Sequence, residues 1–294
     1  MAISTVKFTL NGQTHDLTYD STSGKYKATI TAPSTTSYNV ESDHKYHGTV
    51  KVTNTAGSEI TATVSDFSTL GLRVLEKTKP SISVTYPTAG AYLISAQPTF
   101  QWSVTDAGSG INASTIGVKI DSGSVVTSGI TKTAITNGYS CTYAPGSALS
   151  EGSHTVTFSV TDNDGNAATA VSVSFTVDTV PPTLNVTSPT DNSITNSSTC
   201  TVAGTTNDTT SSPVTVTVNG NPVTVTNGSF STTINLTEGS NTITVVATDA
   251  AGKTTTVTRT VTLDTSVPVI TAVTLTPNPV DAGATYVIEV TVSD

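Results

Sequence analysis

The sequence predicts an all-β protein made of several small two-layer sandwiches, and three observations support this. Charged residues make up only 11% of the 294 residues, against about 25% in an average globular domain, so long amphipathic helices are disfavoured. Threonine and valine, whose branched side chains favour pleated sheet, alternate along segments such as residues 171–177 and 257–263. One strand–turn–strand signature also recurs three times, which is typical of a tandem array of small domains.

The repeated signature consists of a strand, a glycine turn and a second strand, and a proline junction follows it. The turns contain Gly57, Gly165 and Gly252. The junctions contain Pro80, Pro182 and Pro268. Because proline cannot donate to a strand ladder and disfavours helix before it, we expect the junctions to be extended linkers between modules.

Further alternating segments lie between the junctions, and each is predicted to be a short strand. They are residues 60–64, 99–104, 116–120, 155–160, 214–218, 223–226 and 243–246. Asn219-Gly220 and Asn227-Gly228 supply the positive backbone φ of tight hairpins. About seven such strands per module, spaced about 8 to 12 residues apart, indicate tandem immunoglobulin-like β-sandwiches in an elongated array.

The repeats also predict where the modules begin and end. The predicted boundaries are 1–78, 79–179, 180–265 and 266–294. The first module lacks its two opening strands, because residues 6–12 match residues 214–220 in the middle of a later module, whereas the last segment supplies only two opening strands. Three explanations stay open: a truncated fragment, a tail that packs on its own preceding module, or a tail that completes the first module of a neighbouring chain by strand addition.

Two motifs carry a resemblance to a known family. Thr161-Asp162-Asn163-Asp164-Gly165 is followed by a strand and then by Asp178-Thr179-Val180-Pro181. Over roughly residues 80–264 the chain is similar to bacterial immunoglobulin-like repeats. The resemblance implies the sandwich fold and a place in adhesins or in virion proteins of tailed bacteriophages. The N-terminus enters a strand at once without a signal peptide, which favours proteins encoded in phage or prophage tail modules.

Charge and motif content exclude several classes of function. The net charge of −9, with only 12 lysines and arginines, argues against nucleic acid, since phosphate binding needs clustered basic residues. No apolar run approaches the roughly 18 residues of a membrane span. Four histidines without a nucleophile elbow give no support for catalysis, so we expect no enzyme. Cys141 and Cys200 fall in different predicted modules, which argues against a structural disulfide.

Aspartates at the module junctions are the strongest candidates for ligand binding. In the predicted fold, Asp178 in the linker and Asp208 and Asp249 in the loops after two strands gather at one end of a sandwich. Three carboxylates suit calcium, which takes six to eight oxygen ligands, and calcium stiffens such junctions in related repeats. The competing interpretation is that each aspartate only caps its own turn.

The preceding junction offers a similar acidic set but with basic residues in its linker. Asp106, Asp162 and Asp164 come from its loops. Glu76, Lys77 and Lys79 come from its linker. A lysine is expected to compensate the carboxylates there without metal.

The aromatic residues divide into a core position and candidate contact positions. Trp102 alternates with Phe100 and Val104 on one face of a predicted strand, where a sandwich core tryptophan is expected. The candidates for stacking on glycan rings, in or beside loops, are Tyr38, Tyr46, Tyr139 and Tyr143.

These observations predict a non-enzymatic structural or accessory virion protein of a tailed phage or prophage, which decorates the tail or capsid and aids host-surface adhesion. Its expected partners are virion tail or capsid proteins, host-surface glycans, and further copies bound head to tail through the partial end modules. It requires no cofactor beyond calcium at a junction, and it reaches the virion after assembly in the bacterial cytoplasm. The alternative is a fragment of a bacterial cell-surface adhesin.

Overall fold

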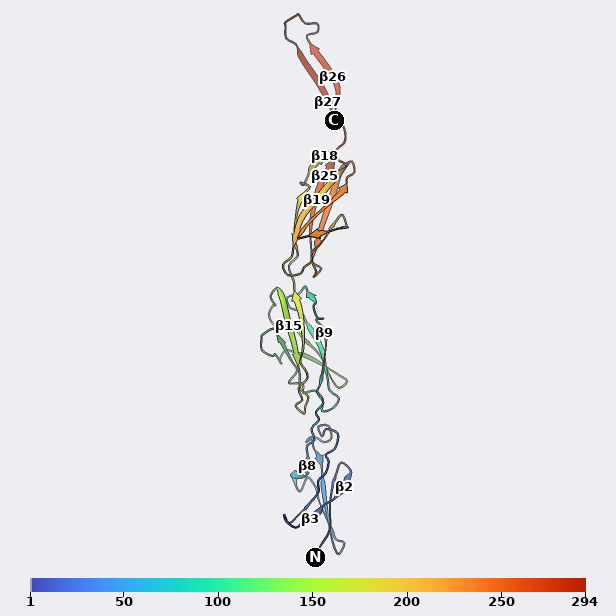
Figure 1. Ribbon diagram of the computed structural model, residues 1–294, viewed down its shortest axis with the longest axis vertical. Coiled ribbons are helices and arrows are strands. Elements are labelled where there is room, and N and C mark those ends of the chain that lie inside the picture. The colour runs from blue at the N-terminus through green and yellow to red at the C-terminus, as the bar shows by residue number, and fades with distance from the viewer. Residues whose placement is uncertain (1) are drawn as a thin grey trace. The chain divides into compact units, whose positions relative to one another are not determined.

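The computed structural model describes residues 2–294, and β-strands dominate them (Figure 1). The chain divides into two compact units, the first ending at Val177 and the second beginning at Asp178. The helical content of the described residues is a single 3₁₀ turn, Ser68–Leu70. No helix in residues 2–294 has the length and apolar character needed to cross a bilayer. The predicted all-β class is therefore confirmed.

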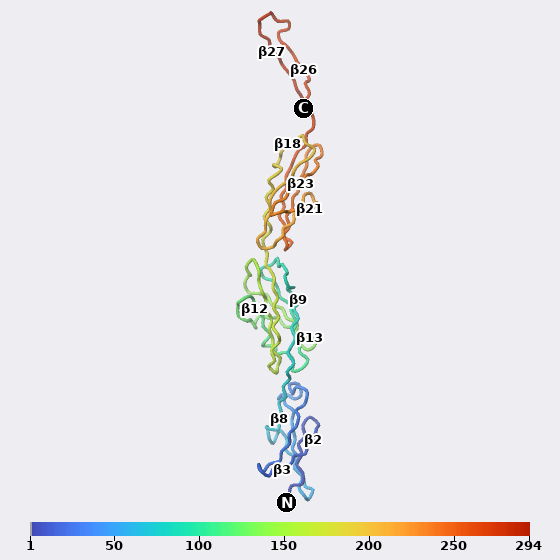
Figure 2. Tube along the Cα trace, in the orientation of Figure 1, coloured from blue at the N-terminus to red at the C-terminus, as the bar shows by residue number. Residues whose placement is uncertain are grey.

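The first sandwich occupies the later part of the first unit, drawn in green in Figure 2. Its two sheets have the orders β13-β14-β11-β9 and β10-β16-β15-β12. The strands are β9 (Ser81–Tyr86), β10 (Tyr92–Leu93), β11 (Phe100–Thr105), β12 (Gly117–Ile120), β13 (Thr131–Ile135), β14 (Gly138–Tyr143), β15 (Gly152–Ser159) and β16 (Val171–Val177). The short β10 pairs in parallel with the last strand, β16.

The second sandwich begins the second unit and repeats this plan. Its sheets have the orders β17-β19-β23-β22 and β18-β25-β24-β20-β21. The strands are β17 (Thr183–Ser188), β18 (Ser193–Thr195), β19 (Thr199–Asn207), β20 (Thr215–Val218), β21 (Asn221–Val223), β22 (Val225–Thr226), β23 (Ser229–Asn235), β24 (Gly239–Thr248) and β25 (Thr254–Leu263). Again a short strand, β18, pairs in parallel with the last one, β25.

The N-terminal region of the first unit contains one four-stranded sheet, of order β2-β1-β6-β7, and two small ribbons, β3-β4 and β5-β8. The strands are β1 (Ile3–Leu10), β2 (Gln13–Asp16), β3 (Thr18–Asp20), β4 (Lys25–Lys27), β5 (Tyr46–His47), β6 (Thr49–Asn54), β7 (Glu59–Ala62) and β8 (Gly71–Leu72). Residues 28–45, between β4 and β5, form no strand. Apart from this sheet and the two ribbons, the region is thus mostly irregular chain.

The C-terminal part of the second unit is a hairpin of β26 (Val269–Thr276) and β27 (Val287–Ser293). Every residue of both strands is exposed. This hairpin buries no apolar face within the described chain, unlike the sheets of the two sandwiches.

One predicted strand is divided between two sheets. The alternation over residues 223–226 predicts a single strand, but β21 ends at Val223 and pairs with β20, whereas β22 begins at Val225 and pairs with β23 of the opposite sheet. Val223 and Val225 both pack against the second sandwich's core. The prediction of one strand was wrong because two valines spaced two apart satisfy either arrangement.

Alternating apolar residues fill the cores as the sequence predicts. Phe100, Trp102 and Val104 of β11 are 0–1% exposed, and the ring centroid of Trp102 lies 4.7 Å from that of Phe158 on the opposite sheet. The predicted core position of Trp102 is therefore confirmed. The second sandwich has a separate core that includes Val202 and Ile243.

Core packing in the first sandwich predicts different costs for two isoleucines. Ile116 is 0% exposed and Ile94 is 61% exposed. We expect Ile116→Ala to lower the free energy of unfolding by about 2–5 kcal/mol through lost burial and a cavity, and Ile94→Ala to change it by less than about 0.5 kcal/mol. Urea titration monitored by Trp102, the only tryptophan in the chain, reports on this sandwich. Equal effects of the two substitutions would contradict the assigned core.

Candidate metal centre

Three buried aspartates meet at the start of the second sandwich. Asp178 opens the second unit, Asp208 follows β19 and Asp249 follows β24. One carboxylate oxygen from each lies within 4.8 Å of the others. Their residues are only 0%, 9% and 6% exposed, respectively. The structure thus brings together the three residues that the sequence predicted as ligands.

One oxygen of each carboxylate caps a local turn. Oδ1 of Asp208 accepts hydrogen bonds from the backbone N–H groups of Thr210 and Ser211, at 2.8 and 2.7 Å. Oδ1 of Asp249 accepts from the N–H of Lys253 at 2.8 Å. Oδ1 of Asp178 likewise accepts from the N–H of Val180 at 3.1 Å. Turn capping and ligand binding are therefore compatible, because capping uses only one oxygen of each group.

The carboxylate oxygens that do not cap a turn are the evidence for a bound ligand. Oδ2 of Asp178 and Oδ2 of Asp249 are buried and have no hydrogen-bond partner. The same holds for the hydroxyl of Ser211, whose carbonyl accepts a hydrogen bond from the N–H of Ala250. None of the ion pairs in residues 2–294 involves any of the three aspartates. Burying ionised carboxylates without a compensating charge is costly.

A divalent cation would offset that cost. It would neutralise the clustered charges and give the unpartnered oxygens a ligand, and hard oxygen donors of this kind suit calcium. Asp178, Asp208 and Asp249 would hold it, and the hydroxyl of Ser211 is a further buried oxygen beside them. The donor set therefore fits calcium.

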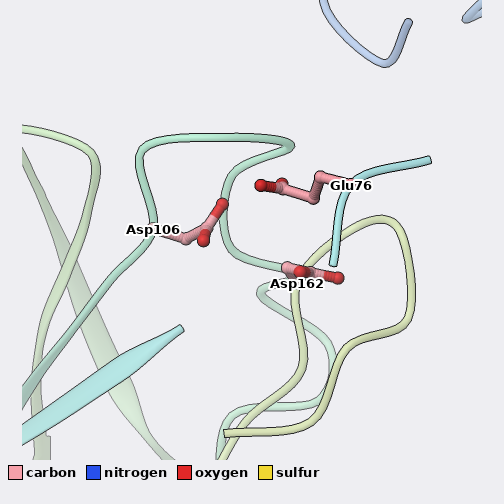
Figure 3. Close-up of side chains that lie close together, drawn as sticks. All are labelled: Glu76, Asp106 and Asp162. Carbon is pink, nitrogen blue, oxygen red and sulfur yellow. The ribbon is translucent and has the colours of Figure 1, made fainter. Parts of the chain in front are cut away.

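A corresponding cluster lies in the first unit. Figure 3 shows the carboxyl groups of Glu76 and Asp106 directed toward each other, with Asp162 on the neighbouring loop. Here the carboxylates are already engaged: Asp106 accepts from the N–H groups of Gly108 and Gly110. Oδ1 and Oδ2 of Asp162 both accept from Asn166, and Glu76 accepts from the N–H of Ser109. Within residues 2–294, no buried oxygen of this cluster lacks a partner.

Charge compensation at this first cluster differs from the sequence prediction. The expected cation was a lysine of the linker, but the residue that forms an ion pair is Arg73, 3.1 Å from Oδ1 of Asp164, whose other oxygen accepts from the N–H of Glu76. Within residues 2–294, no ion pair involves Glu76, Asp106 or Asp162 themselves. The Asp164 side chain is 1% exposed, and its Oδ2 also accepts from the hydroxyl of Thr36. The prediction named the wrong residue because Arg73 lies seven positions before Pro80 and therefore outside the predicted linker.

The four candidate glycan-binding tyrosines do not share one loop surface. Tyr46 lies in β5 and is 4% exposed, with its hydroxyl bonded to Thr35. Tyr139 and Tyr143 lie in β14 and pack against the first sandwich's core. Only Tyr38 lies outside a strand, and its ring is stacked on His44 at 4.1 Å. The three strand tyrosines lie at or within one residue of a strand end, so all four are in or beside loops as expected, but they do not form one surface.

Two family models match parts of the chain. Residues 89–179 match a bacterial Ig-like domain, and residues 182–265 match glucodextranase, domain B. The two complete sandwiches are therefore tandem immunoglobulin-like sandwiches.

A curated relative and several solved structures are also similar. Bacillopeptidase F of Bacillus subtilis (strain 168) is 36% identical over 115 residues, which are 39% of this chain and 8% of that protein, so the match spans a small part of that relative's length. Fibronectin(III)-like modules of Clostridium thermocellum CbhA are 17% identical over 63% of this chain and 94% of theirs, with a TM-score of 0.38. A fragment of three immunoglobulin domains of titin is 13% identical over 89% of this chain and 88% of its own, with a TM-score of 0.42.

A buried histidine in the first sandwich is a separate titratable group. His154 is 7% exposed, and its ring nitrogens lie 2.8 Å from Oδ2 of Asp121 and 2.8 Å from the carbonyl oxygen of Ser150. Because both partners accept, the doubly protonated ring suits this site best. Burial by itself lowers the pKa of His154, but the bonds to Asp121 and Ser150 outweigh it and raise the pKa above its usual value.

This raised pKa makes the stability of the first sandwich depend on pH. The folded state binds the proton more tightly than the unfolded state, so the added stability is complete below about pH 6.5 and is lost as pH rises through the folded-state pKa. We expect the free energy of unfolding to fall by about 1 kcal/mol or less between pH 6 and pH 8, because the Asp121 side chain is 43% exposed and solvent screens the pair. In His154→Asn this decline should disappear from urea titrations monitored by Trp102. If the free energy of unfolding of His154→Asn fell with pH as in the wild type, His154 would not be the group responsible.

Proposed function

We propose that the chain is a non-catalytic structural spacer in which calcium at Asp178, Asp208 and Asp249 fixes the linker to the second sandwich. Immunoglobulin-like folds are typically non-catalytic and suit structural or adhesive roles. The observation that carries the proposal is the pair of buried, unpartnered oxygens on Asp178 and Asp249. An acidic cluster whose oxygens all had partners would give no reason for a bound ion.

The position of Asp178 gives the bound ion its mechanical effect. Asp178 directly follows Val177, which is 0% exposed in the core of the first sandwich. Asp208 and Asp249 belong to loops of the second sandwich. An ion held by all three ties the first residue of the linker to the loops that follow it. Calcium therefore removes rotational freedom from the linker without any chemical reaction.

Calcium should stabilise the second sandwich against heat. Binding at 100 times Kd adds about 2.7 kcal/mol, which for a domain of this size corresponds to a rise in Tm of about 10 °C or more. Asp249→Asn should abolish the calcium response, and in EGTA it should raise Tm because one buried charge is gone. Differential scanning calorimetry of the full chain measures both effects. Asp281→Asn, at an exposed position, is the matched control and should retain the wild-type response.

The calcium-binding proposal fails if the wild-type chain has the same Tm in calcium and in EGTA. It also fails if Asp249→Asn and Asp281→Asn respond to calcium alike, because the ion would then bind elsewhere.

Linker stiffening is tested separately from binding. Nitroxide labels at the exposed positions Thr133 and Thr242, in a chain with Cys141→Ala and Cys200→Ala, report the distances between the two sandwiches by electron paramagnetic resonance. Calcium should narrow the distance distribution at least about twofold relative to EGTA, since it removes torsional freedom from the linker. Asp249→Asn should keep the broad distribution in both conditions. A calcium-dependent Tm with an unchanged distribution would leave the ion bound but overturn the spacer function.

The setting that we propose for the spacer is the virion of a tailed phage or prophage, with the bacterial cell surface as the alternative. Repeated copies of a stiff module raise the effective concentration of weak contacts in either setting. Immunogold electron microscopy with an antibody against this chain, applied to phage particles and to intact cells, distinguishes the two settings.

The proposal gives no glycan-binding role to Tyr46, whose ring is buried, or to Tyr38, whose ring already stacks on His44.

A further inference from the structure

Ser211 has a buried hydroxyl that no hydrogen bond of the fold accounts for. The residue is 0% exposed, and its Oγ has no hydrogen-bond partner. Within residues 2–294, four buried side-chain nitrogen or oxygen atoms lack a partner. One is the indole nitrogen of Trp102, and the other three belong to Asp178, Asp249 and Ser211. Because an unpartnered buried polar atom is costly, three of them in one cluster call for a common explanation.

The backbone of Ser211 lies between the loops that carry Asp208 and Asp249. Its N–H donates to Oδ1 of Asp208 at 2.7 Å. Its carbonyl oxygen accepts from the N–H of Ala250 at 3.3 Å, and Ala250 directly follows Asp249. These two bonds hold Ser211 beside the cluster, while its hydroxyl is used by neither loop.

The first sandwich shows what the equivalent serine does where the protein supplies a partner. Ser109 stands three residues after Asp106 and is 1% exposed. Ser211 stands three residues after Asp208. The hydroxyl of Ser109 accepts a hydrogen bond from the N–H of Asp164 at 3.2 Å. The hydroxyl of Ser211 has no such bond, so a partner from outside the chain would have to satisfy it.

We propose that the hydroxyl of Ser211 is a further ligand of the cation at Asp178, Asp208 and Asp249. This inference rests on the proposed function, because it assigns another residue to the same ion. Oxygens that share one calcium ion each lie about 2.3–2.6 Å from it, so two of them can stand about 5 Å apart without a hydrogen bond between them. One oxygen of each aspartate lies within 4.8 Å of the others, which fits that spacing.

A neutral ligand suits the charge of this site. Three ionised carboxylates already exceed the charge of a divalent cation by one, so a fourth carboxylate would add repulsion. A hydroxyl adds an oxygen ligand without charge, and calcium accepts uncharged oxygens beside carboxylates. A buried water molecule is the competing partner of the Ser211 hydroxyl. Water brings no positive charge to the three carboxylates, which favours the cation.

Alanine substitution at the two equivalent serines tests the assignment in the full chain. By isothermal titration calorimetry, the Kd for calcium should be at least about tenfold higher for Ser211→Ala than for the wild type, since losing even an outer partner of a metal ligand has an effect of this size. Ser109→Ala is the matched control and should bind calcium as the wild type does, because its hydroxyl already has a protein partner.

The titrations separate failure of this inference from failure of the proposed function. Wild-type affinity in Ser211→Ala, together with lost binding in Asp249→Asn, would overturn the role of Ser211 and leave the ion in place. A wild-type chain that binds no calcium would overturn both.

Thermal stability without calcium distinguishes an ion ligand from a structural hydroxyl. In EGTA, Ser211→Ala should leave Tm unchanged or raise it, since it removes a buried oxygen that has no partner. Ser109→Ala should lower Tm by about 4–8 °C, because it removes the acceptor of a buried hydrogen bond. Differential scanning calorimetry measures both. A fall in Tm of Ser211→Ala like that of Ser109→Ala would mean that a water molecule or a protein group uses the hydroxyl, and would overturn the proposal.

A change of ligand chemistry gives a readout that a structural role would not produce. In the Cys141→Ala, Cys200→Ala background, Ser211→Cys replaces the hydroxyl by a thiol, a soft donor that disfavours calcium and favours softer ions such as cadmium. The thiol loses its proton when it binds a metal, so titration with cadmium should give the ultraviolet charge-transfer band of a cadmium–thiolate bond. Ser109→Cys in the same background is the control and should give a much weaker band. Equal bands from the two variants, or no band from folded Ser211→Cys, would overturn the proposal.

Discussion

The period-two alternation of apolar and small polar residues is the constraint on which the structure depends. With charged residues at 11%, the chain has few ionic contacts to define its elements, so facing sheets must bury each other's apolar sides. In both sandwiches this produces a thin core between two sheets, centred on residues such as Trp102 and Ile243. A sheet with only one layer leaves such residues exposed to water, as in the C-terminal hairpin of β26 and β27.

Much of the fold and part of the candidate site follow from this alternation. Asp178, Asp208 and Asp249 could be placed together from the sequence because Asp208 and Asp249 follow strands β19 and β24 of the second sandwich, whose loops lie where the chain enters it, and Asp178 stands in the linker that enters there. The sequence also held a signal for Glu76 that was not used: it stands four residues before Pro80, as Asp178 stands four before Pro182. Repeat position was therefore a better guide to this ligand position than the type of charged residue in the linker.

The failures concern side-chain direction and distant pairing, which periodicity does not encode. Tyr46 occupies a polar stretch of sequence, yet its ring is buried because the two-residue strand β5 pairs with β8. Arg73 reaches Asp164 across 91 residues of sequence, and no local pattern relates the two. The division of residues 223–226 between two sheets depends on packing that either assignment of the valines would satisfy.

The two acidic clusters indicate how two repeats of the same plan acquire different chemistry. Both hairpins have the form Asp-x-x-Gly, but Asp164 in the first stands where Ala251 stands in the second. Asp164 forms an ion pair with Arg73 and accepts hydrogen bonds from the Thr36 hydroxyl and the Glu76 N–H. These contacts join the linker to the first sandwich. Because Ala251 occupies that position, the second cluster lacks these contacts and retains two buried carboxylate oxygens without partners. The same scaffold therefore supports a junction held by its own side chains and a junction for which we propose a bound ion.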